Sequence, residues 1–133
     1  MSETTEEYGS PAIRVVAMPA DANATGDIFG GWIMSHVDVA GAIAAARRAG
    51  GRVVTVAIHG LTFKKPVLVG DVVSFYAEVV RIGRTSITTK VDVYAERRLD
   101  TRECVKVTEA ELTYVAIDDE RQPRVVPQEG AGA

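Results

Sequence analysis

A single apolar segment with one carboxylate in its middle constrains the fold of this chain more than any other feature. Between Asn23 and Gly50, a glycine-rich entry leads into a run with almost no polar face. A helix that is apolar on all sides is buried rather than laid on a surface, so the segment predicts a long central helix. Its apolar members are Ile33, Met34, Val37, Val39, Ala40, Ile43, Ala44 and Ala45.

Asp38 is the carboxylate inside this apolar run. Burying an unpaired carboxylate is unfavourable, so the group must be bound by partners, exposed in a cleft or used in chemistry. We interpret Asp38 as a catalytic residue. The alternative is a buried carboxylate that only binds a neighbouring backbone group.

The ends of the helix carry recognisable signals. Asp27 is a candidate N-cap or first-turn acid. Arg47 and Arg48 lie where the last turn is expected, and cations there complement the helix dipole. The pair Gly50 and Gly51 then ends the helix.

From Val53 onward the apolar pattern changes from helical to alternating, which predicts strands. The segment 85–96 alternates most regularly and predicts one dry and one wet face, while Gly60 and Glu109 interrupt their segments and predict bulges. One antiparallel sheet wrapped around one long central helix is an α+β fold. The expected strands are Ile13 to Met18, Val53 to Phe63, Asp71 to Ile82, Thr85 to Glu96 and Cys104 to Ile117.

Composition limits the class of protein. A chain of 133 residues with 47 % hydrophobic residues predicts one domain, over 13–126, between flexible tails at 1–12 and 127–133. A net charge of −3 gives no basic patch for nucleic acid. The single cysteine, Cys104, excludes a disulfide within the chain. With no secretion signal and no membrane-spanning run apparent, we expect a cytoplasmic protein that does not insert into membranes.

Several motifs together resemble the hotdog-fold acyl-CoA thioesterases, in particular the YciA-type branch, which is related to the brain-type cytosolic acyl-CoA hydrolases. The resemblance covers roughly 13–127. The motifs are N-x-x-G-D-I-F-G-G-W at 23–32, V-D-V-A-G at 37–41, R-V-V-T-V at 52–56, F-x-x-P-V-x-V-G-D-V-V at 63–73 and T-x-A-x-x-T-Y-V-A at 108–116.

The resemblance implies hydrolysis of acyl-CoA to a free acid and CoA without a metal or other cofactor. It assigns Asp38 as general base or nucleophile, Asn23 as a further site residue, and Gly30 and Gly31 as donors of backbone N–H groups to the thioester carbonyl. It also implies homodimers that assemble into hexamers. Other hotdog thioesterases carry a threonine one turn after the carboxylate, where this chain has Ala42.

Spacing along the helix argues that two subunits share each site. Asp38 lies seven residues after Gly31, which is about 10 Å along a helix. A general base must come within about 3 Å of its proton, directly or through one water. We therefore predict that the glycine amides of one subunit face Asp38 of the other. The alternative role of the glycines is close packing at the dimer interface.

Coenzyme A brings phosphates, which favour cations and hydroxyl groups near the site. The turn containing Arg84, Thr85 and Ser86 is our first candidate, and Lys64 is the second, with Lys65 and Arg52. Val54 and Thr55 are expected to line the pantetheine arm. We interpret His36, His59 and Cys104 as structural residues and predict no metal site.

Two other functions remain open from the sequence. One is a non-catalytic protein that binds or senses acyl-CoA. The other is a hotdog dehydratase acting on hydroxyacyl thioesters, which is the weaker reading because no His/Asp hydration pair is evident.

Overall fold

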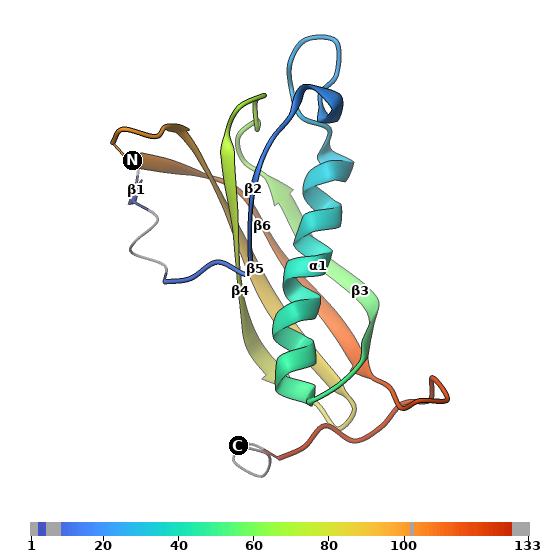
Figure 1. The fold of residues 1–133 in the computed structure, drawn as a ribbon. Helices are drawn as coiled ribbons and strands as arrows, with labels where there is room; N and C mark the ends of the chain where they lie inside the picture. The colour runs from blue at the N-terminus through green and yellow to red at the C-terminus, as the bar shows by residue number, and fades with distance from the viewer. Residues whose placement is uncertain (1–2, 5–8, 102, 129–133) are drawn as a thin grey trace.

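One long helix lies along the concave face of a single antiparallel sheet in the computed structural model (Figure 1). The structure describes residues 3–4, 9–101 and 103–128. The α+β fold with a central helix is confirmed. A 3-10 turn at Pro19–Asp21 precedes α1, Gly30–Ala49, and the strands are β1, Glu3–Thr4; β2, Ile13–Val16; β3, Val53–Phe63; β4, Val72–Ile82; β5, Ser86–Arg98; and β6, Glu103–Ala116.

The strand order places β6 beside β3, the strand that carries candidate site residues. The sheet runs β1-β6-β5-β4-β2, and β3 also pairs with β6. In β1, Glu3 and Thr4 pair with Glu103 and Cys104, so this part of the predicted N-terminal tail joins the sheet. Most other residues of the tails at 1–12 and 127–133 lie outside the described part or outside any element, and their flexibility stays a prediction.

The core lies between the helix and the sheet. The alternation predicted in β5 is confirmed on its dry face, where Ile87, Thr89, Val91, Val93 and Ala95 are buried. The helix contributes Ile33, Val37, Ala40, Gly41, Ala45 and Ala49 to this core.

The prediction of a wet opposite face was wrong at three positions of β5. Thr88, Tyr94 and Glu96 are buried. Tyr94 packs edge-on against Tyr76, with ring centroids 5.9 Å apart, in a second apolar cluster that also contains Cys104. Alternation alone could not reveal this cluster, because its members come from three separate strands.

The N-terminal end of the helix differs from the prediction. The residue before the first turn is Phe29, which makes no side-chain cap, and the first turn contains no acid. Asp27 is therefore not the N-cap. It forms a bridge with Leu68 and its N–H bonds the side chain of Asn23, because the loop turns again before the helix begins.

The C-terminal end of the helix follows the prediction. Arg47 and Arg48 lie in the last turn, and Gly50 adopts a left-handed φ of 71° that favours glycine. The guanidinium of Arg124 also donates to the last helical carbonyl, that of Ala49, at 2.9 Å. The positive charge thus lies at the negative end of the helix dipole.

The two predicted bulges have different outcomes. Gly60 has a φ of 60° and lies where the β3–β6 register shifts, so a bulge there is confirmed. Glu109 instead pairs regularly with Thr62 and with Asp92. The irregularity on the β5 side of β6 lies at Val107, between two pairs whose spacing differs on the two strands.

The helix is buried on one face only within the single chain. Met34 and Val39 are 38 % and 51 % exposed, so the prediction of burial on all sides is not met by one copy of the chain. The strand β3 has a partner on one side only, and its Val56 and Ile58 are 54 % and 43 % exposed. An unpaired, apolar sheet edge of this kind favours association.

Candidate active site

Asp38 receives two side-chain hydroxyl groups on one oxygen. The hydroxyl of Thr55 donates to Asp38 Oδ1 at 2.7 Å, and the hydroxyl of Tyr114 lies 3.1 Å from the same atom. Tyr114 also donates to the backbone carbonyl of Asp38 at 2.7 Å. Asp38 is half-buried, so the carboxylate is both held by the protein and open to the outside.

The strand register explains why the two hydroxyls meet. Thr55 of β3 lies directly opposite Tyr114 of β6. Directly opposite residues in an antiparallel pair point to the same face of the sheet. Both side chains therefore reach the helix at Asp38. The register shifts immediately after this pair, at Val56.

Tyr114 was missed by the sequence analysis, although it lies within one of the quoted motifs. Its side chain is fully buried. Burial is the main cause that raises the pKa of its hydroxyl, and the charge of Asp38 adds to this effect. The group therefore stays a neutral donor at any physiological pH. No sequence pattern indicates which residue a buried tyrosine will face.

Gly41 lies one turn after Asp38 and provides the space for this contact. A β-carbon at this position would collide with the hydroxyl oxygen of Tyr114 and lie 2.8 Å from Thr89 Oγ1. The role of Gly41 was also not predicted. Its position in the V-D-V-A-G motif is the signal that could have suggested it.

The start of the helix carries two free backbone donors. Among the described residues, none accepts a hydrogen bond from the N–H of Gly30 or Gly31. A β-carbon on Gly30 would lie 3.3 Å from the ring of Phe63, whereas one on Gly31 would meet nothing within 4 Å. A hollow of about 340 Å³ adjoins this end, lined by Ile28, Gly30, Ile33, Phe63, Lys64, Lys65, Pro66 and Val67.

Asn23 is occupied by local contacts. Its side-chain oxygen accepts from the N–H of Thr25 at 3.0 Å, from the hydroxyl of Thr25 at 2.9 Å and from the N–H of Asp27 at 3.1 Å. It stabilises the loop before the helix, as an asparagine in a turn often does. Its catalytic role stays a prediction.

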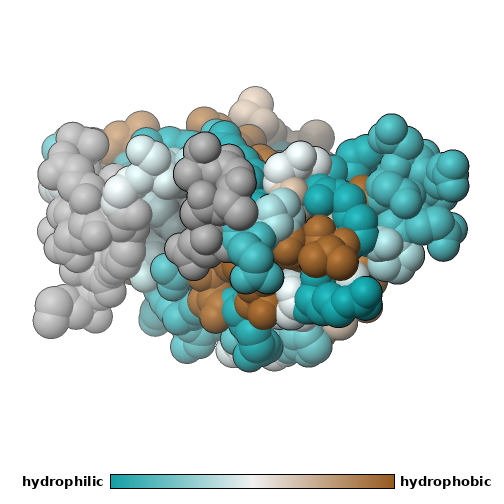
Figure 2. All heavy atoms as spheres, turned by 90° about the horizontal axis from the view of Figure 1, so that it is seen from below, coloured by the Kyte–Doolittle hydropathy of each residue, from teal (hydrophilic) through white to brown (hydrophobic). Residues whose placement is uncertain are grey.

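The two groups of candidate CoA-binding residues lie at opposite ends of the helix. Arg84 is exposed and lines a hollow of about 460 Å³ with Arg48, at the lower end of the molecule. Figure 2 views this end and shows apolar patches separated by hydrophilic side chains. Thr85 and Ser86 are half-buried beside this turn.

Lys64 lies near the start of the helix and is already paired. Its ammonium group is 3.2 Å from a carboxylate oxygen of Glu109, which also bonds Lys106 at 2.8 Å. Hydrogen bonds from Lys106 and Lys64 lower the pKa of Glu109 to about 2. Val54 is half-buried next to Thr55. These assignments to CoA stay predictions.

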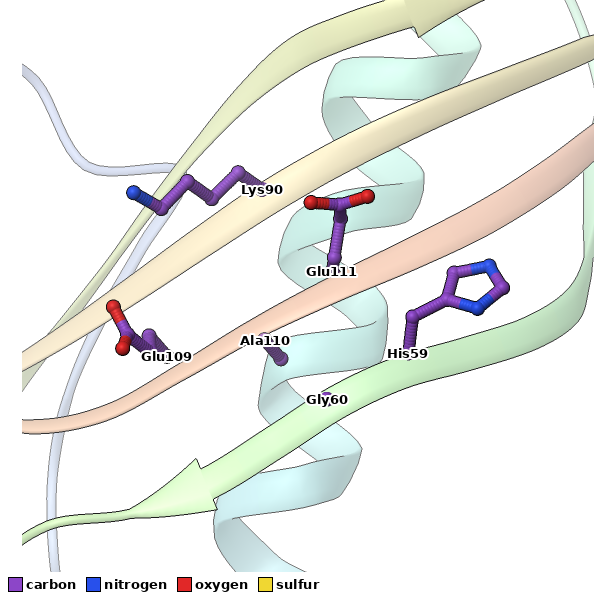
Figure 3. Close-up of a pocket in the computed structure, with 6 residues that line it drawn as sticks. All are labelled: His59, Gly60, Lys90, Glu109, Ala110 and Glu111. Carbon is purple, nitrogen blue, oxygen red and sulfur yellow. The ribbon is translucent and has the colours of Figure 1, made fainter.

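Neither histidine contacts Asp38 within the described residues. A ring nitrogen of His36 lies 2.8 Å from the carbonyl of Trp32, and the ring stacks on Phe75. His59 bonds the hydroxyl of Thr113 at 2.9 Å and lines a hollow of about 390 Å³ with charged side chains of β5 and β6 (Figure 3). In that view the helix lies behind the sheet, so this hollow opens on the face away from Asp38.

The described ranges contain no cluster of three or more His, Cys, Asp or Glu side chains that could hold a metal ion. They also contain no helix of the length and hydrophobicity needed to cross a membrane.

Comparison with known proteins identifies the family. Residues 25–101 match the thioesterase superfamily. The chain is 49 % identical over 123 residues to the acyl-CoA thioester hydrolase YciA of Escherichia coli, covering 91 % of this chain and 93 % of that one. It is similar in structure to a hexameric thioesterase from Yersinia pestis, with a TM-score of 0.84 and 50 % identity over 90 % of this chain and 97 % of that one.

A third relative is an acyl-CoA hydrolase from Staphylococcus aureus, solved with butyryl coenzyme A and coenzyme A. It has a TM-score of 0.82 and 31 % identity over 86 % of this chain and 70 % of that one. Structures of this hydrolase include one aspartate-to-alanine and one threonine-to-alanine variant. The two substituted positions are 17 residues apart, the same separation as Asp38 and Thr55.

The sequence match, the shared fold and the order of elements agree with one another and with the motifs of the sequence. The chain therefore belongs to the thioesterase superfamily, has the hotdog fold and is most similar in character to its YciA-type acyl-CoA thioester hydrolases.

Proposed function

We propose that this protein hydrolyses acyl-CoA thioesters to a free acid and coenzyme A. The observation that carries the proposal is the half-buried carboxylate of Asp38, held on one oxygen by Thr55 and Tyr114. The relatives named above are acyl-CoA hydrolases, and the S. aureus enzyme was studied with substitutions at an aspartate and a threonine of the same spacing.

The chemistry follows from these groups. Asp38 takes a proton from water, whose oxygen adds to the thioester carbonyl, or attacks that carbon directly and is later released by water. In either route the C–S bond breaks and the sulfur leaves as the thiol of CoA. The free N–H groups of Gly30 and Gly31 stabilise the negative charge that forms on the carbonyl oxygen. The reaction needs no metal or redox cofactor.

Two copies of the chain are needed to assemble this site. Gly31 and Asp38 are about 10 Å apart along one helix, too far to act on a single carbonyl. The exposed helix residues Met34 and Val39 and the unpaired edge of β3 offer an apolar surface to a second copy. We propose a homodimer in which Gly30 and Gly31 of one subunit face Asp38 of the other. The hexameric relative from Y. pestis supports a trimer of such dimers.

The experiment that tests the proposal measures thiol release from a short and a long acyl-CoA by the purified protein. We expect CoA and free acid to appear in equal amounts, in proportion to enzyme. A protein that binds acyl-CoA without releasing thiol would be a sensor instead. Hydration or dehydration of a hydroxyacyl or enoyl thioester, with the thioester bond intact, would indicate a dehydratase.

The position of the CoA phosphates can be tested separately. We propose that they bind at Arg84, since this cation is exposed, lines a hollow with a second arginine, Arg48, and has no side-chain partner among the described residues. Replacing Arg84 with glutamine is expected to raise KM for acyl-CoA about tenfold with little change in kcat, because one charge-assisted contact to phosphate is lost.

The matched comparison is Lys64→Gln at the other end of the helix, where the cation is already paired with Glu109. A normal KM for Arg84→Gln together with a raised KM for Lys64→Gln would move the phosphate site to the start of the helix. Equal KM values for a substrate truncated to its pantetheine part would confirm that the affected contact is made to the nucleotide.

A further inference from the structure

We infer that Tyr114 is a positioning residue for the hydrolytic reaction, holding one oxygen of Asp38 so that the other oxygen acts on water or on the thioester. The inference rests on the proposed function, because it gives Tyr114 a role only if Asp38 is the reacting carboxylate.

The contacts to Asp38 are unequal between its two oxygens. Oδ1 accepts from Thr55 at 2.7 Å and lies 3.1 Å from the hydroxyl of Tyr114. Within the described ranges, no group forms a hydrogen bond with Oδ2. The two donors come from neighbouring strands and fix the plane of the carboxylate, which leaves the lone pairs of Oδ2 for chemistry.

The hydroxyl of Tyr114 also bonds the carbonyl of Asp38, at 2.7 Å. A single donor therefore joins the backbone and the side chain of the same residue, and this restricts rotation of the side chain about its own bonds. Groups that act on a reacting atom must be held close to the productive geometry by their neighbours. Thr55 alone could not supply this restraint, because it lies on an exposed edge strand.

The helix accommodates the hydroxyl by a glycine. A side chain at Gly41 would collide with the hydroxyl oxygen of Tyr114. Glycine inside a helix is less favourable than alanine, and a phenylalanine at Tyr114 would need no such space for an oxygen. The chain thus contains two residues whose combination is explained by the contact with Asp38.

The state of the hydroxyl suits this role. Burial, and next the negative charge of Asp38, raise the pKa of Tyr114 above its ordinary value. The group consequently keeps its proton over the whole range in which a thioesterase is assayed, and it acts as a constant donor rather than as an acid or base.

The test compares Tyr114→Phe with wild type and with Tyr94→Phe, which changes a buried tyrosine in the second apolar cluster. We expect Tyr114→Phe to lower kcat about tenfold and to change KM less than about twofold, because the contact orients a reacting group and binds no substrate. Tyr94→Phe is expected to keep the wild-type kcat. Thermal unfolding and the oligomeric state are measured for both variants.

The same substitution in an Asp38→Ala background separates positioning from general stabilisation. If Tyr114 acts through the carboxylate, adding Tyr114→Phe to Asp38→Ala causes no further loss of turnover. Equal fractional losses in both backgrounds, or a wild-type kcat for a folded Tyr114→Phe variant, would overturn the inference. Failure of the proposed function would look different, since the wild-type protein itself would then release no thiol.

Discussion

Replacing Asp38 with asparagine or alanine is expected to reduce thioester turnover by a factor of about 10² to 10⁴, the usual contribution of a positioned general base. Asparagine has nearly the same shape, and its carbonyl oxygen can still accept from Thr55 and Tyr114. It cannot take a proton from water or attack the thioester carbon at neutral pH. The measurement is thiol release under saturating acyl-CoA, with CoA binding determined separately.

The control for this substitution is Asp119→Asn, the same chemical change at an exposed position. It is expected to leave turnover and stability unchanged. If both Asp38 variants are folded, assembled and as active as wild type, then Asp38 is a satisfied polar residue of the interior, and the mechanism proposed above is wrong.

Introducing a methyl group at Gly41 is expected to lower both stability and turnover. The added β-carbon collides with the hydroxyl of Tyr114 and approaches Thr89 Oγ1 to 2.8 Å. Overfilling a packed interior typically costs about 1–3 kcal/mol of unfolding free energy. Displacement of the hydroxyl also removes its contact with Asp38. Urea unfolding and thiol release of Gly41→Ala measure the two effects.

A second variant identifies the cause. Gly41→Ala combined with Tyr114→Phe removes the colliding oxygen, so we expect it to regain part of the stability lost by Gly41→Ala, without recovering its turnover. Ser35→Ala is the matched control on the exposed face of the same helix and is expected to be near neutral. A Gly41→Ala variant as stable and active as wild type would show that the space around the hydroxyl adjusts freely.

The sequence was most informative where one local pattern determines the structure. The apolar run around Asp38 predicted the central helix, and Gly50 marked its end. The alternation of β5 predicted its dry face. Asp27 was misassigned because several loop residues can cap a helix in principle, and only the path of the loop decides which of them does.

The contacts of the site depend on long-range pairing, which no local pattern contains. Thr55 was predicted to line the pantetheine arm, but its hydroxyl bonds Asp38. Tyr114 was not predicted at all, because only the β3–β6 register places it opposite Thr55. Likewise, a buried and an exposed apolar residue look identical in sequence, so the open helix face around Val39 appeared only in the structure.

The pairing of Thr55 with Tyr114 makes strand length as important for this enzyme as residue identity. Shifting β3 by one residue would turn Thr55 to the opposite face of the sheet, away from Asp38, even if every residue of the site were retained. An insertion or deletion between Val53 and Thr55 would have that result, whereas the irregularity at Val56 already absorbs a change of spacing beyond the pair. Over evolution, the loops at either end of β3 can change in length, while its first turn of pairing with β6 cannot.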